Sequence, residues 1–224
     1  MLFDPLSLIL PYYCCSCGVI GAILCEGCYY DIVSEPNQRC LACQRPFRPD
    51  GSCNCRRSYG QSWCVGPHEG SLKALVAASK FDSARAGCDR QAELLSHVLP
   101  ELPSDVVVVP VPTIARHVRQ RGYGHAERIA KQLAKHRKLS YQEIFARTSQ
   151  LVQHGATRSA RTAQARRSYR LARQVQPGAT YLIVDDVYTT GATIDALARL
   201  LKGAGAKPAQ IWVAVTTRQP TDAS

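Results

Sequence analysis

The sequence lacks a long apolar run and a recognisable export signal. Its early apolar stretch, residues 6–10, is far shorter than the ~20 residues that a transmembrane helix needs, and no later window is apolar enough. The first residues, MLFDPLSLILP, contain Asp4 and no basic run before the apolar stretch, unlike a signal peptide. We therefore expect a cytoplasmic protein without a membrane span.

Two nucleotide-binding signatures are also missing. The sequence contains neither a P-loop nor a G-x-G-x-x-G fingerprint, which argues against ATP hydrolysis and against redox chemistry with a dinucleotide. Any nucleotide or phosphate site must therefore use another kind of loop.

Cysteine is nearly absent from the second part of the chain, because ten of the eleven cysteines lie at or before Cys64 and only Cys88 follows. A secreted protein would usually spread its disulfides through the fold. In the cytosol thiols stay reduced, and clustered cysteines more often bind metal. Cys15 and Cys88 have no spacing partner and are interpreted as small buried residues.

The remaining early cysteines have the spacing of metal-binding knuckles, with three C-x-x-C pairs and one C-x-C pair. Two knuckles complete a tetrahedral zinc site. The simplest assignment takes neighbouring pairs, which gives Cys14, Cys17, Cys25 and Cys28 for one site, and Cys40, Cys43, Cys53 and Cys55 for the other. Crossed pairing stays open, and Cys64 is an alternative for one member of the shortened last pair.

Residues 1–64 are therefore predicted to form a cysteine-rich double zinc ribbon with one or two structural zinc ions. This segment has few large apolar residues, and structural zinc supplies ~10–16 kcal/mol in such peptides, so the metal would act as its core. Buried free thiols, the alternative, would not need such regular spacing.

The charge is as uneven as the cysteine content. Residues 1–64 carry five basic and five acidic side chains, so the whole net charge of +11 belongs to residues 65–224. Residues 112–138 hold eight basic residues and one acid, and residues 147–173 hold seven arginines and no acid. A partner with negative charge is expected to bind the second part.

Residues 65–224 have the alternating pattern of an α/β domain. Helical spacing is found over residues 71–79, 85–99, 126–136 and 194–202, and short runs typical of buried strands over 105–112, 180–186 and 210–217. This alternation predicts a mostly parallel sheet with ligands bound at the carboxyl ends of its strands.

One such strand end carries unusual chemistry. The apolar strand leads directly to Asp185 and Asp186, which are followed by a small, hydroxyl-rich turn over Thr189–Thr193 that opens a helix. Backbone N–H groups at a helix N-terminus favour a phosphate, while paired carboxylates suit sugar hydroxyls or Mg²⁺. The alternative is an ordinary helix cap next to a solvated strand end.

The run LIVDDVYTTGAT resembles the phosphoribosyl-pyrophosphate (PRPP) loop of type I phosphoribosyltransferases, in which a hydrophobic strand is followed by two acids, two spacers and Thr-Thr-Gly. The resemblance implies that Asp185 and Asp186 contact the ribose hydroxyls of PRPP, bound with Mg²⁺. It also implies that the 5′-phosphate lies in a cradle formed by Thr189, Thr190, Gly191, Ala192 and Thr193.

Residues 109–126 resemble the pyrophosphate-side loop of the same superfamily, which leads from a strand into an Arg-Gly-aromatic element and a helix. The resemblance implies that Arg121 and backbone N–H groups near Gly122 stabilise the leaving pyrophosphate. Lys80 is a further candidate for the phosphates. Arg116 and Arg119 offer guanidinium groups as well, or belong to a solvated basic face. Gly124 departs from the Asn that the family commonly has.

The order of motifs along the chain, from the cysteine pairs through Lys80, VPVP and RGY to VDDVYTTGAT, resembles that of the ComF family. That family joins a double zinc ribbon to a phosphoribosyltransferase-like, Rossmann-like domain and is associated with competence, the uptake of DNA. The resemblance implies PRPP or a nucleotide as ligand and DNA-uptake proteins as partners. Two functions compete: a PRPP-using transferase, for which residues 158–170 would be a mobile cover, and a non-catalytic module that binds single-stranded DNA and uses the PRPP site as a sensor. In the second case Tyr123, Tyr141, Phe145 and Tyr169 would stack on bases, unless they are core residues.

Overall fold

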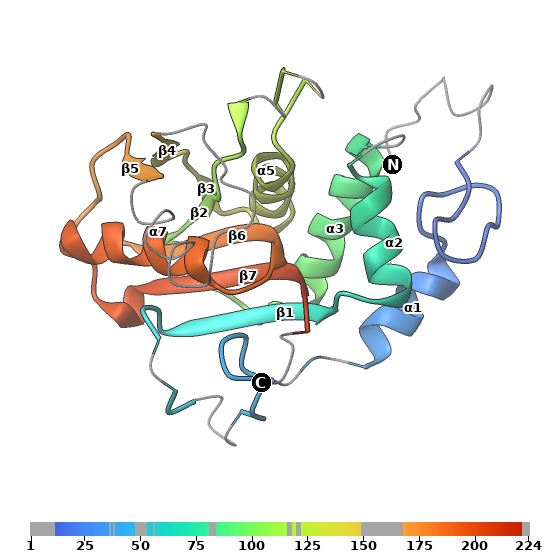
Figure 1. Cartoon of the computed structure of the whole chain (residues 1–224), viewed down its shortest axis with the longest axis horizontal. Coiled ribbons are helices and arrows are strands. Elements are labelled where there is room, and N and C mark those ends of the chain that lie inside the picture. The colour runs from blue at the N-terminus through green and yellow to red at the C-terminus, as the bar shows by residue number, and fades with distance from the viewer. Residues whose placement is uncertain are drawn as a thin grey trace, which may run out of the picture.

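A five-stranded parallel sheet forms the centre of the molecule (Figure 1). The computed structural model describes residues 12–35, 37, 39–47, 53–55, 57–80, 84–115, 118–119, 122–148 and 168–220. The strand order is β1-β7-β6-β2-β3, and every pair in this sheet is parallel. The bounds are Gln61–Pro67 for β1, Val106–Pro110 for β2, Ser140–Tyr141 for β3, Thr180–Tyr188 for β6 and Ile211–Arg218 for β7. The predicted α/β fold with a mostly parallel sheet is confirmed.

Helices cover both faces of the sheet. One face packs against α1 (Glu26–Ser34), α2 (Gly70–Ala78), α3 (Ala84–Val98) and α5 (His125–Arg137). The other packs against α7 (Ala192–Gly203) and a two-stranded antiparallel ladder of β4 (Phe145–Arg147) and β5 (Tyr169–Leu171). Successive side chains of a strand point to opposite faces. Accordingly, Val106 and Val108 belong to the first core, whereas Val107 and Val109 belong to the second.

Strand β6 is longer than its neighbour β2, and this difference creates the edge at which the site lies. The β2–β6 register ends where Pro110 pairs with Val184, while the β6–β7 register continues from Asp185 opposite Val215 to Tyr188 opposite Arg218. Asp185 and Asp186 therefore extend beyond the end of β2 and leave one side of β6 open.

The cysteine-rich segment packs against both faces. Leu24 belongs to the core under α2 and α3, and Leu41 to the core under α7. In Figure 1 the cysteine loop over residues 12–25 lies beside α1, and the cysteine loop over residues 39–47 lies below β1. The predicted division at residue 64 falls inside β1, which begins at Gln61. The separation into domains 1–64 and 65–224 stays a prediction.

Candidate functional site

A cavity of about 320 Å³ opens at the carboxyl ends of β2 and β6. This is the edge at which open α/β sheets bind ligands. The lining combines two carboxylates, cations from separate elements, and small polar groups. Its residues are Lys80, Val111, Pro112, Thr113, Ile114, His125, Ala126, Arg147, Tyr169, Asp185, Asp186 and Thr193.

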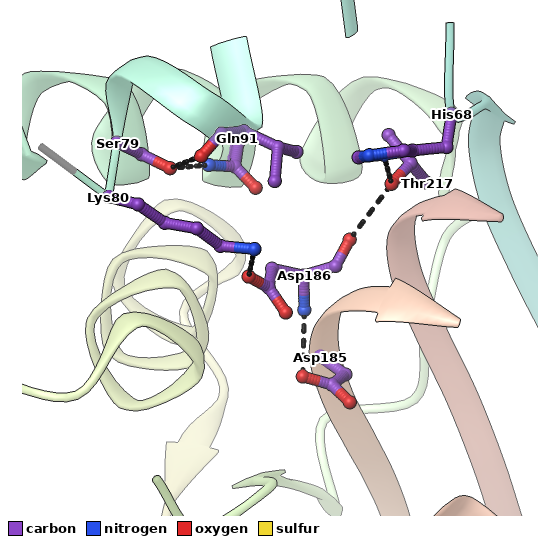
Figure 2. A network of polar contacts seen from close by, with 8 residues as sticks. His68, Ser79, Lys80, Gln91, Asp185, Asp186 and Thr217 are labelled. Atoms are coloured by element: carbon purple, nitrogen blue, oxygen red, sulfur yellow. Dashed lines mark hydrogen bonds and ion pairs between the residues drawn. The ribbon is translucent and has the colours of Figure 1, made fainter. Parts of the chain in front are cut away.

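The paired carboxylates lie on β6 and are held by the backbone and by a cation. The backbone N–H of Asp186 donates to Asp185 Oδ1 at 2.9 Å. Lys80 Nζ reaches Asp186 Oδ2 at 3.3 Å from the end of α2 (Figure 2). Burial raises the pKa of Asp185 well above its ordinary value, the neighbouring Asp186 carboxylate raises it further, and Lys80 opposes the rise. The site therefore holds Asp185 in an environment that favours its protonated form.

The carbonyl of Asp186 is part of the same network (Figure 2). Thr217 Oγ1 donates to this oxygen at 3.4 Å and lies 2.9 Å from His68 Nδ1. Burial lowers the pKa of His68, and Lys80 and Lys73 lower it further. His68 and Thr217 thus connect the ends of β1 and β7 to the acidic end of β6.

The turn over Thr189–Thr193, which is predicted to bind a phosphate and is called the phosphate turn below, connects β6 to the start of α7. Gly191 has φ 77° and immediately precedes the helix, and Thr190 Oγ1 accepts from the N–H of Ala192 at 3.4 Å. Thr189 and Thr190 are exposed, and Thr193 lines the cavity. The first backbone N–H groups of α7 point out of its N-terminus, which favours an anion there.

The predicted pyrophosphate-side loop contributes its strand end to the cavity through Val111, Pro112, Thr113 and Ile114. Gly124 caps α5, and a Cβ there would lie 2.2 Å from a carboxylate oxygen of Glu127 and would displace that side chain. Gly122 has φ 81°, is exposed and is not among the lining residues. Arg116 and Arg121 lie outside the described residues, and Arg119 is exposed away from the lining.

Three further lining residues are His125, Arg147 and Tyr169. None was named individually for this cavity, although His125 lies in the predicted pyrophosphate-side loop and Tyr169 in the predicted cover. Arg147 Nη1 donates to the Tyr169 hydroxyl at 3.1 Å, and its guanidinium lies 5.2 Å from the Tyr169 ring centre. Burial raises the pKa of Tyr169, which also interacts with Thr193 of the phosphate turn. The sequence signal for this contact was weak: Arg147 is the first residue of the arginine-rich stretch over residues 147–173.

The other proposed base-stacking aromatics take part in the packing of the two cores, and their stacking on bases stays a prediction. Phe145 is buried in the core under α7, whereas Tyr123 and Tyr141 are half-buried against the core under α2 and α3. Most of the predicted mobile cover, residues 158–167, lies outside the described residues, whereas Arg170 is exposed on β5. The strands β4 and β5 flank that segment.

The cysteines form two groups, each with all four sulfur atoms within 4.8 Å of one another. The first cysteine group is Cys14, Cys17, Cys25 and Cys28, and the second is Cys40, Cys43, Cys53 and Cys55. A tetrahedral zinc–thiolate site has sulfur atoms ~3.8 Å apart, given Zn–S bonds of about 2.3 Å. The 3.6 Å between Cys17 and Cys25 Sγ, and between Cys40 and Cys55 Sγ, fits such a site. Each group could therefore hold a structural zinc ion, with the neighbouring pairs assigned together.

The remaining cysteines stand apart from these groups. Cys64 is buried on β1, where its thiol donates to the carbonyl of Gly66 at 3.2 Å. It is not a member of the second group, so the alternative ligand set with Cys64 is not the one observed. Cys88 is fully buried, as predicted for a small core residue, whereas Cys15 is only half-buried.

Comparison with known proteins identifies the family. Residues 104–224, more than half of the chain, match the family model "Phosphoribosyl transferase domain". "DNA utilization protein YhgH" of Salmonella typhi is 30% identical over 221 residues, covering 92% of this chain and 97% of its own length. "Competence protein F" of Haemophilus influenzae is 26% identical over 209 residues, which cover 84% of this chain and 88% of its own length. The chain belongs to the ComF family.

In this ComF chain the matched residues 104–224 contain β6 and the phosphate turn, whereas Lys80 and both cysteine groups precede them. "DNA utilization protein YhgH" of Escherichia coli K12 is 32% identical over 114 residues, about half of each chain. Within the part of the ComF chain that the structure describes, no helix is both long and apolar enough to cross a membrane.

Proposed function

We propose that this chain binds PRPP together with Mg²⁺ in the cavity at the ends of β2 and β6. The observation that carries the proposal is the arrangement of two adjacent carboxylates, one paired with Lys80, directly before a threonine-rich turn at the N-terminus of α7. Carboxylates bind ribose hydroxyls, and the helix N-terminus binds the 5′-phosphate. Arg147 supplies a further cation to the cavity lining.

In a transfer reaction, pyrophosphate leaves the anomeric carbon of PRPP while a nucleophile attacks it, and negative charge grows on the leaving group. Bound Mg²⁺ would neutralise part of this charge. The chain's own contribution is to orient the ribose through Asp185 and Asp186, to fix the phosphate at the turn, and to place cations nearby. Arg121 is the proposed further contact to the leaving pyrophosphate.

Calorimetric titration with PRPP and Mg²⁺ tests the binding proposal. The variant with Asp185→Asn and Asp186→Asn should lose at least tenfold in affinity, because neither side chain can then offer a carboxylate to the ribose hydroxyls. Asp195→Asn is the matched control, since Asp195 lies in the first turn of α7 but outside the cavity lining. Equal affinities of the wild type and the double variant would contradict the proposal.

Catalysis is a separate question from binding. Pyrophosphate release in the presence of PRPP, Mg²⁺ and a panel of nucleobases would establish a transferase. PRPP binding without release across the panel would favour a non-catalytic sensor.

The second candidate function is single-stranded DNA binding in DNA uptake. It is favoured by the +11 charge outside the cysteine-rich segment and by relatives whose names refer to competence and DNA utilization. Binding through phosphate neutralisation weakens steeply as salt rises. Replacing Arg166 and Arg167 with Gln should make this salt dependence shallower, and an unchanged slope would count against a role for these residues.

A further inference from the structure

Lys80 forms an ion pair with Asp186 that is partly exposed to solvent, so this contact holds the lysine side chain in place only weakly. The side chains of Lys80 and Asp186 are 33% and 17% exposed. Partly exposed ion pairs contribute at most about 1 kcal/mol and also cost the entropy of ordering a lysine. A well-defined position of the Lys80 ammonium group therefore requires further contacts that hold the backbone next to Lys80.

Ser79, the residue before Lys80, is such a fixed point. It caps α2, is fully buried, and its backbone N–H donates to the carbonyl of Leu75 at 3.0 Å. Its hydroxyl donates to the carbonyl of Val76 at 2.8 Å. Because that bond uses the single hydroxyl hydrogen, Ser79 Oγ can only accept from a further partner.

Gln91 of α3 supplies the donor. Its Nε2 lies 2.8 Å from Ser79 Oγ, and Figure 2 shows the two side chains meeting above Lys80 and Asp186. One turn earlier on α3, a Cβ at Gly87 would lie 2.8 Å from the Cβ of Ser79. Helix α3 thus holds Ser79 through close packing at Gly87 and through a directional hydrogen bond from Gln91.

The buried side-chain amide of Gln91 lowers the stability of the folded protein. Gln91 is fully buried beside Ala92, Leu94 and Leu95, and its Oε1 has no hydrogen-bond partner among the described residues. Burying an amide that is only partly satisfied costs roughly 1–3 kcal/mol. An apolar residue of similar size would fill the core without this cost, so filling the core does not by itself account for the amide.

We propose that Gln91 is a positioning residue for the cavity: through Ser79 it fixes the end of α2 from which Lys80 reaches Asp186. This inference rests on the proposed function, in which Asp186 binds the ribose of PRPP. Lys80 then balances the charge of two adjacent carboxylates before the ligand arrives.

A double-mutant cycle tests the proposal in the full-length, zinc-loaded protein. Gln91→Met keeps the shape and removes the donor, and Lys80→Met removes the cation. Each single variant should weaken PRPP·Mg²⁺ binding about five- to tenfold, and the double variant should bind no more weakly than Lys80→Met alone. Losses that multiply in the double variant would show that Gln91 acts independently of Lys80 and would overturn the proposal.

The control is Leu95→Met at a fully buried position of the same helix, because leucine offers Ser79 no hydrogen-bond donor to lose. It should leave the affinity within twofold of the wild type. A similar loss in Leu95→Met and Gln91→Met would indicate general loosening of α3 and would contradict a specific role of Gln91.

A second readout works without any ligand. Amine acylation followed by mass spectrometry should modify Lys80 several-fold faster in Gln91→Met and in Asp186→Asn than in the wild type, with exposed Lys131 as internal reference. If Lys80 reactivity rises but the wild type does not bind PRPP, the positioning role stands and the proposed function fails. If the wild type binds PRPP but neither reactivity nor affinity responds to Gln91→Met, the positioning role fails alone.

Discussion

Gly191 meets two separate requirements that only glycine satisfies together. Its φ of 77° lies in the left-handed region, and a Cβ there would lie 2.1 Å from the hydroxyl oxygen of Tyr188. The ring of Tyr188 is buried under the phosphate turn. The turn is therefore shaped both by its own backbone and by the aromatic residue that precedes it.

Gly191→Ala should destabilise the protein more than Gly178→Ala does. Gly178 has a similar φ of 82° but open space around its Cβ position, so it isolates the backbone strain. The left-handed conformation costs alanine about 1–2 kcal/mol, and displacing Tyr188 should add at least about 1 kcal/mol at Gly191. Urea unfolding of both variants measures the difference, and equal losses would show that Tyr188 yields freely.

Asp185→Asn should stabilise the protein, and more so at pH 8 than at pH 5. A raised pKa means that the folded chain holds this proton more tightly than the unfolded chain does. Ionisation therefore costs stability as the pH rises above the ordinary aspartate value of about 3.9, until the raised pKa is passed. The cysteine thiols also titrate, but they do so in both proteins. Their contribution therefore cancels in the difference between the unfolding free energies of the variant and the wild type. A difference that does not change with pH would contradict the shift.

Arg147→Met should weaken PRPP·Mg²⁺ binding about tenfold, the equivalent of losing one charge-assisted hydrogen bond of ~1.4 kcal/mol. Arg170→Met on the paired strand removes the same charge from an exposed position outside the cavity lining. It should change the affinity less than twofold. Calorimetry on both variants separates a contact in the cavity from a general loss of positive charge, which would affect them equally.

The candidate site divides into residues that sequence reasoning could find and residues that it could not. Asp185, Asp186 and Thr193 lie within one short segment, so their spacing alone brings them together. Arg147 and Tyr169 are 22 positions apart and meet only because β4 and β5 pair. No local pattern encodes such a pairing.

At the scale of elements, the long apolar strands and the amphipathic helices were predictable. Strands β2, β6 and β7 are runs of apolar and β-branched residues buried on both faces, and the expected helices match α2, α3, α5 and α7. Strand β1, with the sequence QSWCVGP, has no such run and ends in Gly-Pro. Its strand conformation depends on pairing with β7, so the sequence around it does not predict it.

The two cysteine groups are attached to different structural elements and should differ in their effect on the cavity. Cys14 and Cys28 belong to the core under α2 and α3. Next to the second group, the backbone carbonyl of Leu41 accepts from Arg218 Nε at 2.8 Å, and the guanidinium of Arg218 lies 6.0 Å from the Tyr188 ring centre. The second group is thereby connected to the residue that shapes the phosphate turn.

Cys40→Ser/Cys43→Ser should lower PRPP affinity, whereas Cys14→Ser/Cys17→Ser should retain it within about threefold. We expect two zinc ions per wild-type chain and one in each variant, which elemental analysis of the purified proteins measures. Equal effects of the two variants on affinity would show that the second group has no special connection to the turn. Fewer than one zinc ion per wild-type chain would exclude the structural zinc sites.

At the scale of the whole molecule, the cysteine-rich segment and the transferase region share their hydrophobic cores. Leu24 and Leu41 are almost completely buried, one against each face of the sheet. A metal that binds only the folded state stabilises everything that unfolds with it.

Removing zinc with a strong chelator should therefore lower the melting temperature of the entire chain. Calorimetry should show one transition that moves to lower temperature, with the far-UV circular dichroism of the helices following it. Two transitions, with that of the sheet region unchanged, would show that the cysteine-rich segment unfolds independently.

The strand order has a consequence for the synthesis of the protein. Among the described residues, strand β1 lies at the edge of the sheet and pairs only with β7, which follows the other described strands along the chain. During translation the cysteine loops can capture zinc early, since their ligands are close in sequence, but β1 has no partner until β7 leaves the ribosome. The first described strand of this sheet must therefore wait for the last described one, and until then its unpaired edge is open to pairing with other chains.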